Sequence, residues 1–343
     1  MKHKIQTHNW LIICILFKSL IVTNTANAWT QQSHSRMTQD ALLYMGSDHA
    51  SPDQKRAYNF YLVSAGDLQT ALTVLGKSAS EVDDFKDTRL GHWWSNYQHG
   101  LSYLIVNNNT SLWHFISIGQ PKNTEDNDKE DYTGYSFQNR TKDPRIFNND
   151  TLLSVFLYNQ QLHYNDYITT ATHYSDHGTP ISYENYQKFQ SATWEPIDHL
   201  ADYWFQQFVN KPSFQSIAYV THAAAEVAVA HHTWNTFANY HYEYETWVAD
   251  FYDIESLSNF EQIEQALNAY NPEHTIRDIV TQSAKQAYCL PEPLYDPRHQ
   301  GRLKVAKTMI PSAIATIVTV LTKAVNNVYG EDANDTNRPL YNE

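Results

Sequence analysis

The feature that most restricts the fold of this chain is a long run without glycine or proline, residues 213–232, which is rich in alanine. Alanine has the highest helix propensity, whereas glycine and proline are the residues that most often interrupt helices. Such a run is typical of a helix buried among other helices. The sequence therefore predicts a buried helix over these residues.

Other stretches carry helix signals as well. Ser51 and Gln54 form a capping box with Pro52 at the first helical position. Residues 196–209 have apolar side chains at helical spacing, and a helix capped by Ser258 is expected to run through residue 269. Residues 311–325 are very apolar, but Lys323 and the short length favour a core helix over a membrane-spanning one.

Strand signals are scarce in this chain. Few segments alternate polar and apolar residues, and ten glycines among 343 residues are too few for the turns of a multi-stranded barrel or sandwich. Residues 120–150 are polar and aperiodic and predict a surface loop. We find no internal repeat and no second-domain boundary. We therefore expect an all-α fold with a single multi-helix domain.

The first 28 residues have the three parts of an export signal. Lys2 and Lys4 form a basic start, residues 11–22 are mostly apolar, and residues 26–28 read Ala-Asn-Ala, an A-x-A cleavage site. The apolar run is shorter than a membrane span of roughly 20 residues. We expect cleavage before Trp29, which leaves residues 29–343 as a secreted or periplasmic catalytic domain.

The mature chain would be strongly acidic. Loss of Lys2, Lys4 and Lys18 leaves 21 basic residues against 37 acidic ones, a net charge of −16. Such a chain is a poor architectural binder of nucleic acid, although metal ions can supply positive charge to an enzyme that cleaves phosphodiesters. Cys289 is the one cysteine after the signal, so the mature chain forms no internal disulfide.

Two pairs of metal-ligand residues follow one another closely. His222 and Glu226 are spaced i, i+4, so a helix places both on one face, as two ligands of one ion require. On a continuous helix His232 lies about 80° from His222, whereas His231 points to the opposite side. We therefore predict His232 as a ligand and His231 as its structural neighbour. A salt-bridged His–Glu pair is the ordinary alternative.

The same spacing recurs in His241 and Glu245, while Glu243 between them is expected to face solvent. A tyrosine-rich helix with surface carboxylates is the ordinary alternative here. The predicted mature N-terminus adds Trp29 and His34. A free α-amino group titrates near pH 7.7–8.0, so a metal ion can capture its neutral form.

These residues resemble, in type and order, the superfamily of bacterial zinc-dependent phospholipases C and S1/P1 nucleases. Its members begin with tryptophan, carry a histidine soon after, and continue with a His-x3-Asp/Glu-x5-His block and a final His-x3-Asp/Glu pair. The Trp-x4-His spacing of Trp29 and His34 is more similar to the nucleases. Glu245 in the final pair is more similar to the phospholipases.

The superfamily has a further histidine and aspartate between these blocks. His114 opens a His-aromatic-hydrophobic segment of the expected kind. Asp67 is our choice for the aspartate because it stands about where the family places it after the tryptophan. Its separation from His114 is longer than usual. Three other aspartates remain as substitutes: Asp83, Asp84 and Asp87.

The resemblance implies three zinc ions, held by three sets of ligands: Asp67, His114, His222 and Glu226; His232, His241 and Glu245; and Trp29 (amine and carbonyl), His34 and Glu226. Glu226 would then bridge two ions. Asp67 would also act in catalysis by orienting or deprotonating the attacking water. Nitrogen and oxygen donors of this kind suit zinc.

The implied function is hydrolysis of phosphatidylcholine-like phospholipids to diacylglycerol and a phosphorylated headgroup, with transient contact to a membrane surface and no stable nucleic-acid partner. An S1/P1-type single-strand nuclease or nucleotidase is the alternative enzyme. A zinc-binding protein without activity is the alternative from another class. Gln32 and Leu68 differ from the headgroup-pocket residues of the phospholipases, so choline specificity stays open.

Overall fold

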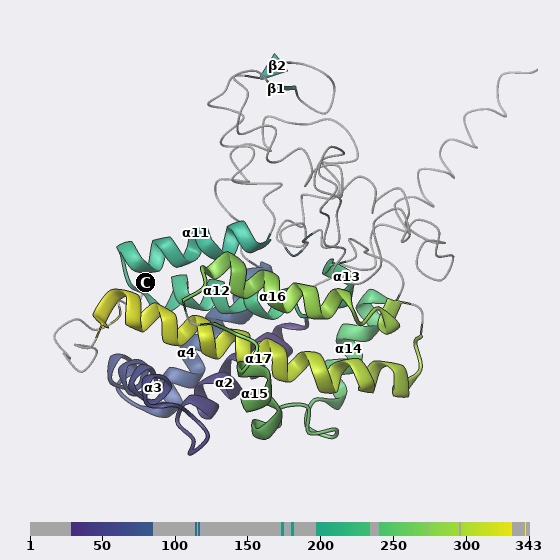
Figure 1. Ribbon diagram of the computed structural model, residues 1–343, viewed down its shortest axis with the longest axis horizontal. Helices are drawn as coiled ribbons and strands as arrows, with labels where there is room; N and C mark the ends of the chain where they lie inside the picture. The colour runs from purple at the N-terminus through teal and green to yellow at the C-terminus, as the bar shows by residue number, and fades with distance from the viewer. Residues whose placement is uncertain are drawn as a thin grey trace, which may run out of the picture.

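The computed structural model describes residues 29–84, 114, 116, 173–174, 180–181, 197–233, 240–271, 273–294, 296–330 and 340. These residues are mostly helical (Figure 1). In chain order the elements are α2 (Gln31–Met45), α3 (Pro52–Ala65), α4 (Leu68–Ser80), η1 (Glu81–Asp84), β1 (His173–Tyr174), β2 (Pro180–Ile181), α11 (Ile197–Asn210), α12 (Phe214–Glu226), α13 (Ala230–Thr233), α14 (His241–Phe251), α15 (Phe260–Leu267), α16 (Ile276–Tyr288), η3 (Glu292–Leu294) and α17 (His299–Tyr329).

The all-α class is confirmed for this part of the chain. Its strand content is the antiparallel pairing of β1 with β2, in which His173 pairs with Ile181 and Tyr174 with Pro180. The predicted signal segment at residues 1–28 and the predicted loop at residues 120–150 lie outside the described residues.

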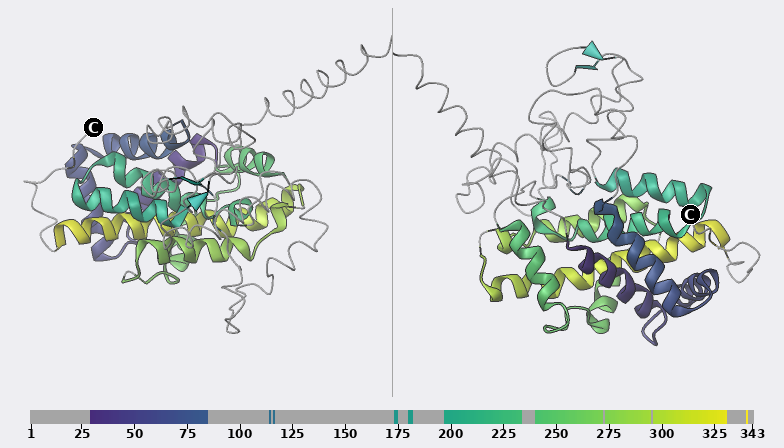
Figure 2. Two further views of the ribbon diagram at one scale, coloured as in Figure 1. Left: turned by 90° about the horizontal axis from the view of Figure 1, so that it is seen from above. Right: turned by 180° about the vertical axis from the view of Figure 1, so that it is seen from behind.

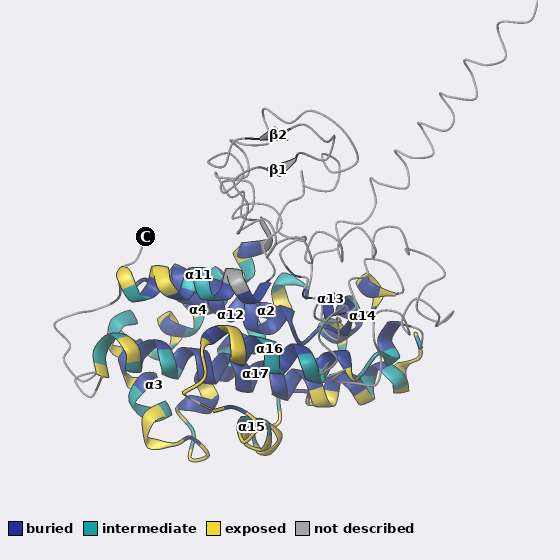
Figure 3. Cartoon of the chain, turned by 45° about the horizontal axis from the view of Figure 1, so that its top comes forward, coloured by how far each residue is buried: buried dark blue, intermediate teal, exposed yellow. Residues whose placement is uncertain are grey.

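The long helix α17 organises the core. Helices α2, α12, α15 and α16 pack against it, and Figure 2 shows from two further sides that it runs along the helical body. Every residue from Met309 to Leu321 is buried, and Figure 3 shows buried residues along α12, α16 and α17. Among the described helices α17 alone is long and apolar enough to cross a membrane, but 83% of its apolar window is buried inside the fold. That burial is typical of a core helix.

Several helix ends lie where the sequence predicts them. The Ser51 capping box is confirmed: the Ser51 hydroxyl accepts from the backbone N–H of Gln54 at 3.3 Å, and the Gln54 side chain accepts from the N–H of Ser51 at 2.8 Å. Helix α15 differs by one residue, because Asn259 rather than Ser258 caps it. Helix α17 begins before the predicted stretch and contains Pro311 in its interior.

The predicted helix over residues 213–232 is wrong in one respect that matters for the site. Helix α12 ends at Glu226, and a turn separates it from α13. A helix end leaves backbone carbonyls without partners inside the helix. The Glu226 carbonyl accepts from the N–H of Val229 at 3.1 Å and lies 2.8 Å from Nδ1 of His232. The break therefore places His232 back over the end of α12.

Candidate metal centre

Histidine and glutamate side chains from several elements meet in the interior of the helical body. α2 supplies one of them, α12 and α14 supply two each, α13 supplies one, and one comes from the chain between α4 and α11. Each is at most 3% exposed. We call these seven residues the cluster: His34, His114, His222, Glu226, His232, His241 and Glu245.

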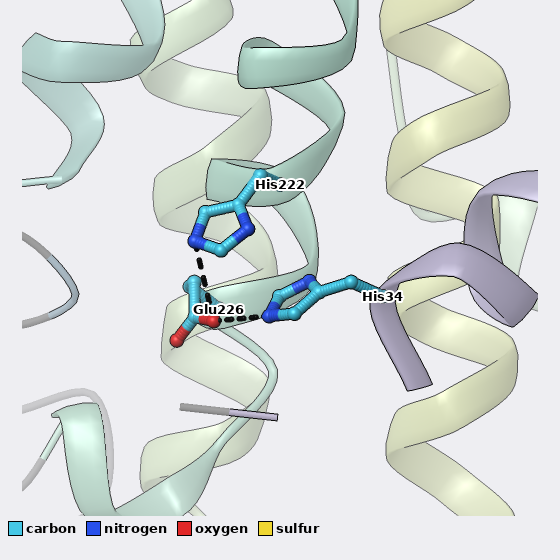
Figure 4. Close-up of side chains that lie close together, drawn as sticks. All are labelled: His34, His222 and Glu226. Atoms are coloured by element: carbon cyan, nitrogen blue, oxygen red, sulfur yellow. Dashed lines mark ion pairs between the residues drawn. The ribbon is translucent and has the colours of Figure 1, made fainter. Parts of the chain in front are cut away.

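The first group in the cluster joins α2 to α12 (Figure 4). Oε1 of Glu226 lies 2.6 Å from Nε2 of His34 and 3.5 Å from Nε2 of His222. The two imidazoles stack with centroids 4.0 Å apart. The i, i+4 pair predicted from the sequence is thus present, and α2 brings a third donor atom to it.

Glu226 also belongs to a second group. Its other oxygen, Oε2, lies 2.9 Å from Nδ1 of His232 and 3.5 Å from Nδ1 of His114. Nε2 of His114 is 3.3 Å from Nε2 of His222. One carboxylate therefore faces four histidines, which is the position expected of a shared ligand.

The third group lies at the start of α14. Nε2 of His241 is 2.8 Å from Oε1 of Glu245 and 2.9 Å from Nε2 of His232. Nε2 of His232 is 3.7 Å from the same carboxylate oxygen. His232 is therefore common to the second and third groups. In each group the candidate ligand atoms all lie within 4.8 Å of one another.

Backbone carbonyls orient two of the histidines. Nδ1 of His222 donates to the carbonyl of Ala79 at 2.9 Å, and Nδ1 of His232 lies 2.8 Å from the carbonyl of Glu226. A carbonyl only accepts, so a proton on Nδ1 leaves a lone pair on Nε2 of each ring. Both Nε2 atoms point into the cluster. Metal-binding histidines commonly have this arrangement, with the second ring nitrogen held by a carbonyl.

Burial disfavours charge throughout the cluster. It lowers the pKa of His222 to about 3 and that of His232 to about 4, and it lowers the pKa of His114 well below its usual range. Burial also raises the pKa of Glu245 to about 8 and that of Glu226 well above its usual range, and repulsion from Glu245 adds to the rise for Glu226. These three imidazoles are therefore held neutral, the form that binds metal.

The surroundings of the Glu226 carboxylate suit a metal ion. Within the described part of the chain, neither oxygen of Glu226 accepts a well-aligned hydrogen bond, although histidine nitrogens lie close by. Buried carboxylate oxygens without donors are costly. Two ligands bound about 2.1 Å from one tetrahedral zinc are about 3.4 Å apart. The 3.5 Å contact of His222 with Glu226 and the 3.7 Å contact of His232 with Glu245 are near that spacing. The contacts of His34 with Glu226 at 2.6 Å and of His241 with Glu245 at 2.8 Å are shorter.

Trp29 lies beside the cluster, as the sequence predicts for a terminal ligand. Its side chain is fully buried, and its indole N–H donates to the carbonyl of Ala225 at 2.8 Å. Its backbone N–H lies near Glu245 and partly opposes the rise of that carboxyl's pKa. The backbone nitrogen of Trp29 is thus directed at the third group.

Asp67 is not part of the cluster, and its prediction as a ligand and catalytic residue requires correction. It is exposed and caps α4: its carboxylate accepts from the backbone N–H of Thr70 at 2.9 Å and from the Thr70 hydroxyl at 2.7 Å. These bonds lower its pKa. An aspartate directly before a helix is a favoured N-cap, and that local preference explains the position.

Of the three aspartates that could substitute for Asp67, the structure describes the backbone of two. Asp83 and Asp84 lie in η1, a few residues after Ala79, whose carbonyl contacts His222. Asp87 lies outside the described residues.

The two adjacent histidines differ in their surroundings, for a reason other than the helix periodicity on which the prediction rests. His232 contributes to two groups, whereas His231 contributes to none and stacks on His241 instead. The grouping also differs from the one that the resemblance implies. His34 joins His222 and Glu226, and His114 joins Glu226 and His232. No pattern in the sequence indicates that the Ala79 carbonyl orients His222.

Comparisons with known proteins find no relative of this chain. No family model matches it, and neither a curated protein nor a solved structure is significantly similar to it.

Proposed function

We propose that this protein is a secreted zinc-dependent phosphodiesterase, and that its reaction is that of a phospholipase C on phosphatidylcholine-like lipids. The observation that carries the proposal is the cluster, in which Glu226 and His232 link three adjoining groups of buried nitrogen and oxygen donors. The resemblance in motif order to the phospholipase C and S1/P1 nuclease superfamily adds the reaction type.

Three sets of residues would hold the ions. We assign them from the spatial groups: His34, His222 and Glu226; His114 and Glu226; and His232, His241 and Glu245. His232 is given to the third set because its free nitrogen, Nε2, lies next to His241 and Glu245. The mature amine of Trp29 would join the third set, next to Glu245. Zinc bound there would neutralise phosphate oxygens and lower the pKa of a water molecule, the two requirements of phosphodiester hydrolysis.

The residues of the chain supply position and protonation state. His222 and His232 present Nε2 because backbone carbonyls hold Nδ1. Glu226 and Glu245 must lose their protons when an ion binds, because a carboxylate and not a carboxylic acid is the ligand. Metal loading should therefore release protons and should weaken as the pH falls.

The net charge of the mature chain is our reason for proposing a lipid substrate rather than a nucleic acid. The mature chain carries a net charge of −16, so a polyanionic strand would meet repulsion at many phosphates. A zwitterionic headgroup presents one phosphate together with a compensating cation. A transient contact with a membrane surface would be sufficient for such a substrate.

A nuclease or nucleotidase is the second candidate, because the Trp29-x4-His34 spacing is closer to that branch of the superfamily. A metal-binding protein without activity is the third. The three differ in what they hydrolyse and whether they hydrolyse at all.

The deciding experiment measures hydrolysis of a chromogenic phosphocholine ester, phosphatidylcholine vesicles and single-stranded DNA by the mature protein, with and without a chelator. We expect chelator-sensitive turnover of the first two, with a higher kcat/KM than for DNA at moderate salt. A preference for DNA would overturn the phospholipase assignment and leave the metal centre standing. No turnover by the zinc-loaded protein would overturn both enzymatic assignments.

A further inference from the structure

One buried histidine beside the cluster has no place in the three groups. His231 is fully buried on α13, directly before the shared ligand His232. Its ring lies parallel to that of His241, with centroids 4.6 Å apart and an angle of 4° between the planes. It is therefore a flat neighbour of a candidate ligand and supplies no atom to the candidate metal groups.

Contacts between aromatic rings continue beyond His231, with the rings tilted rather than parallel. The ring of Tyr244 is 5.9 Å from that of His231 and 5.8 Å from that of Trp29. Tyr244 is fully buried and lies on α14 between His241 and Glu245. A series of four rings thus runs from Trp29 to His241. Both end residues are candidate ligands, and the two inner rings lie between them.

An imidazole needs such support because its second side-chain torsion has only broad minima. Rotation about that torsion moves Nε2 out of line with an ion. For His222 and His232 a backbone carbonyl restrains the rotation. A parallel ring at 4.6 Å restrains His241 from one face, since tilting either ring would bring the two into van der Waals overlap.

We propose that His231 is a positioning residue that fixes the ring plane of His241 and so sets the affinity of the ion held by His232, His241 and Glu245. The proposal rests on the metal centre proposed above. It requires a flat ring at position 231, and it assigns His231 no ligand atom. The affected property is the affinity of one ion, whereas the ions of the other groups keep theirs.

The test compares three variants by competition titration of zinc against a chromophoric chelator, which resolves the successive binding steps. His231→Phe keeps a flat ring, His231→Leu keeps bulk without a plane, and His231→Gln keeps a polar side chain without a ring. We expect about a tenfold weakening of one binding step in the Leu and Gln variants, the lower end of the effect of altering a ligand's support. The Phe variant should stay within about twofold of the parent.

A matched control separates positioning from general destabilisation. Tyr270→Phe removes a buried hydroxyl that bonds to Ser312 and Thr316 in the core, and it should leave every zinc step unchanged. Equal affinities in all three His231 variants, equal losses in Phe and Leu, or weakening of all steps together would each overturn the proposal. Failure of the parent protein to bind zinc would instead overturn the metal centre itself.

Discussion

The two His-x3-Glu pairs have the same spacing in the sequence but different surroundings. His222 and Glu226 lie at the end of α12, where donors from three other parts of the chain reach Glu226. His241 and Glu245 lie at the start of α14, between the exposed residues Tyr240 and Tyr242 and the buried core. The pair His222 and Glu226 therefore lies at the centre of the cluster, and the pair His241 and Glu245 lies at its edge.

This difference is also electrostatic. Glu226 and Glu245 are both buried, and burial raises the pKa of each. Repulsion from Glu245 adds to the rise in the pKa of Glu226, whereas His232 and the Trp29 backbone N–H oppose the rise in the pKa of Glu245. The i, i+4 spacing therefore defines a pair of ligands, while the elements that pack around the pair decide how many ions it serves. A central carboxylate should matter more for metal binding than one at the edge.

The largest effect is expected from removing the central carboxylate. Glu226→Gln should lose the ions of two groups, whereas Glu245→Gln should lose the ion of one, since Glu226 belongs to two groups and Glu245 to one. Elemental analysis of the purified proteins measures this. Glu243→Gln is the matched control, because Glu243 is exposed on the same helix and should keep full zinc content. Equal losses from Glu226→Gln and Glu245→Gln would contradict the distinction.

The second effect concerns the edge of the cluster. We expect active protein to begin at Trp29, because an amide nitrogen has no lone pair available for a metal. A variant with one extra residue before Trp29 should bind less zinc near Glu245 and lose activity. Mass spectrometry of the N-terminus and zinc analysis check this, and enzymatic removal of the extra residue should restore both properties. Full zinc content and activity in the extended protein would refute the assignment.

The smallest effect is expected at Asp67, an acidic residue outside both pairs. Asp67→Ala should keep full zinc content and show only a modest fall in melting temperature, because the residue caps α4. Asp67→Asn should restore the melting temperature, since asparagine caps as well as aspartate does. Loss of zinc in either variant would return Asp67 to the ligand set.

The sequence predicted the parts of the site that depend on local spacing. The pairs His222/Glu226 and His241/Glu245 needed only helical periodicity, and the capping box of Ser51 needed only local hydrogen bonds. The helical class followed from the scarcity of glycine and of alternating patterns.

The remaining features depend on tertiary structure. The break after Glu226 has no glycine or proline to announce it, yet it places His232 over the end of α12. Asp67 has the place in the sequence that the resemblance requires, but its carboxylate caps α4 and does not lie in the cluster. The stacking of His231 on His241 joins two short helices whose packing no spacing in the sequence specifies.

The most direct measurement of the central claim is thermal unfolding of the parent protein and of Glu226→Gln, each with excess zinc and with chelator. If Glu226 is a metal ligand, zinc should stabilise the parent far more than the variant. With chelator the variant should be at least as stable, because the glutamine resembles the protonated carboxyl that burial favours. If instead Glu226 forms a structural ion pair with His34, the variant should lose about 3–5 kcal/mol even with chelator. That result would contradict the metal centre.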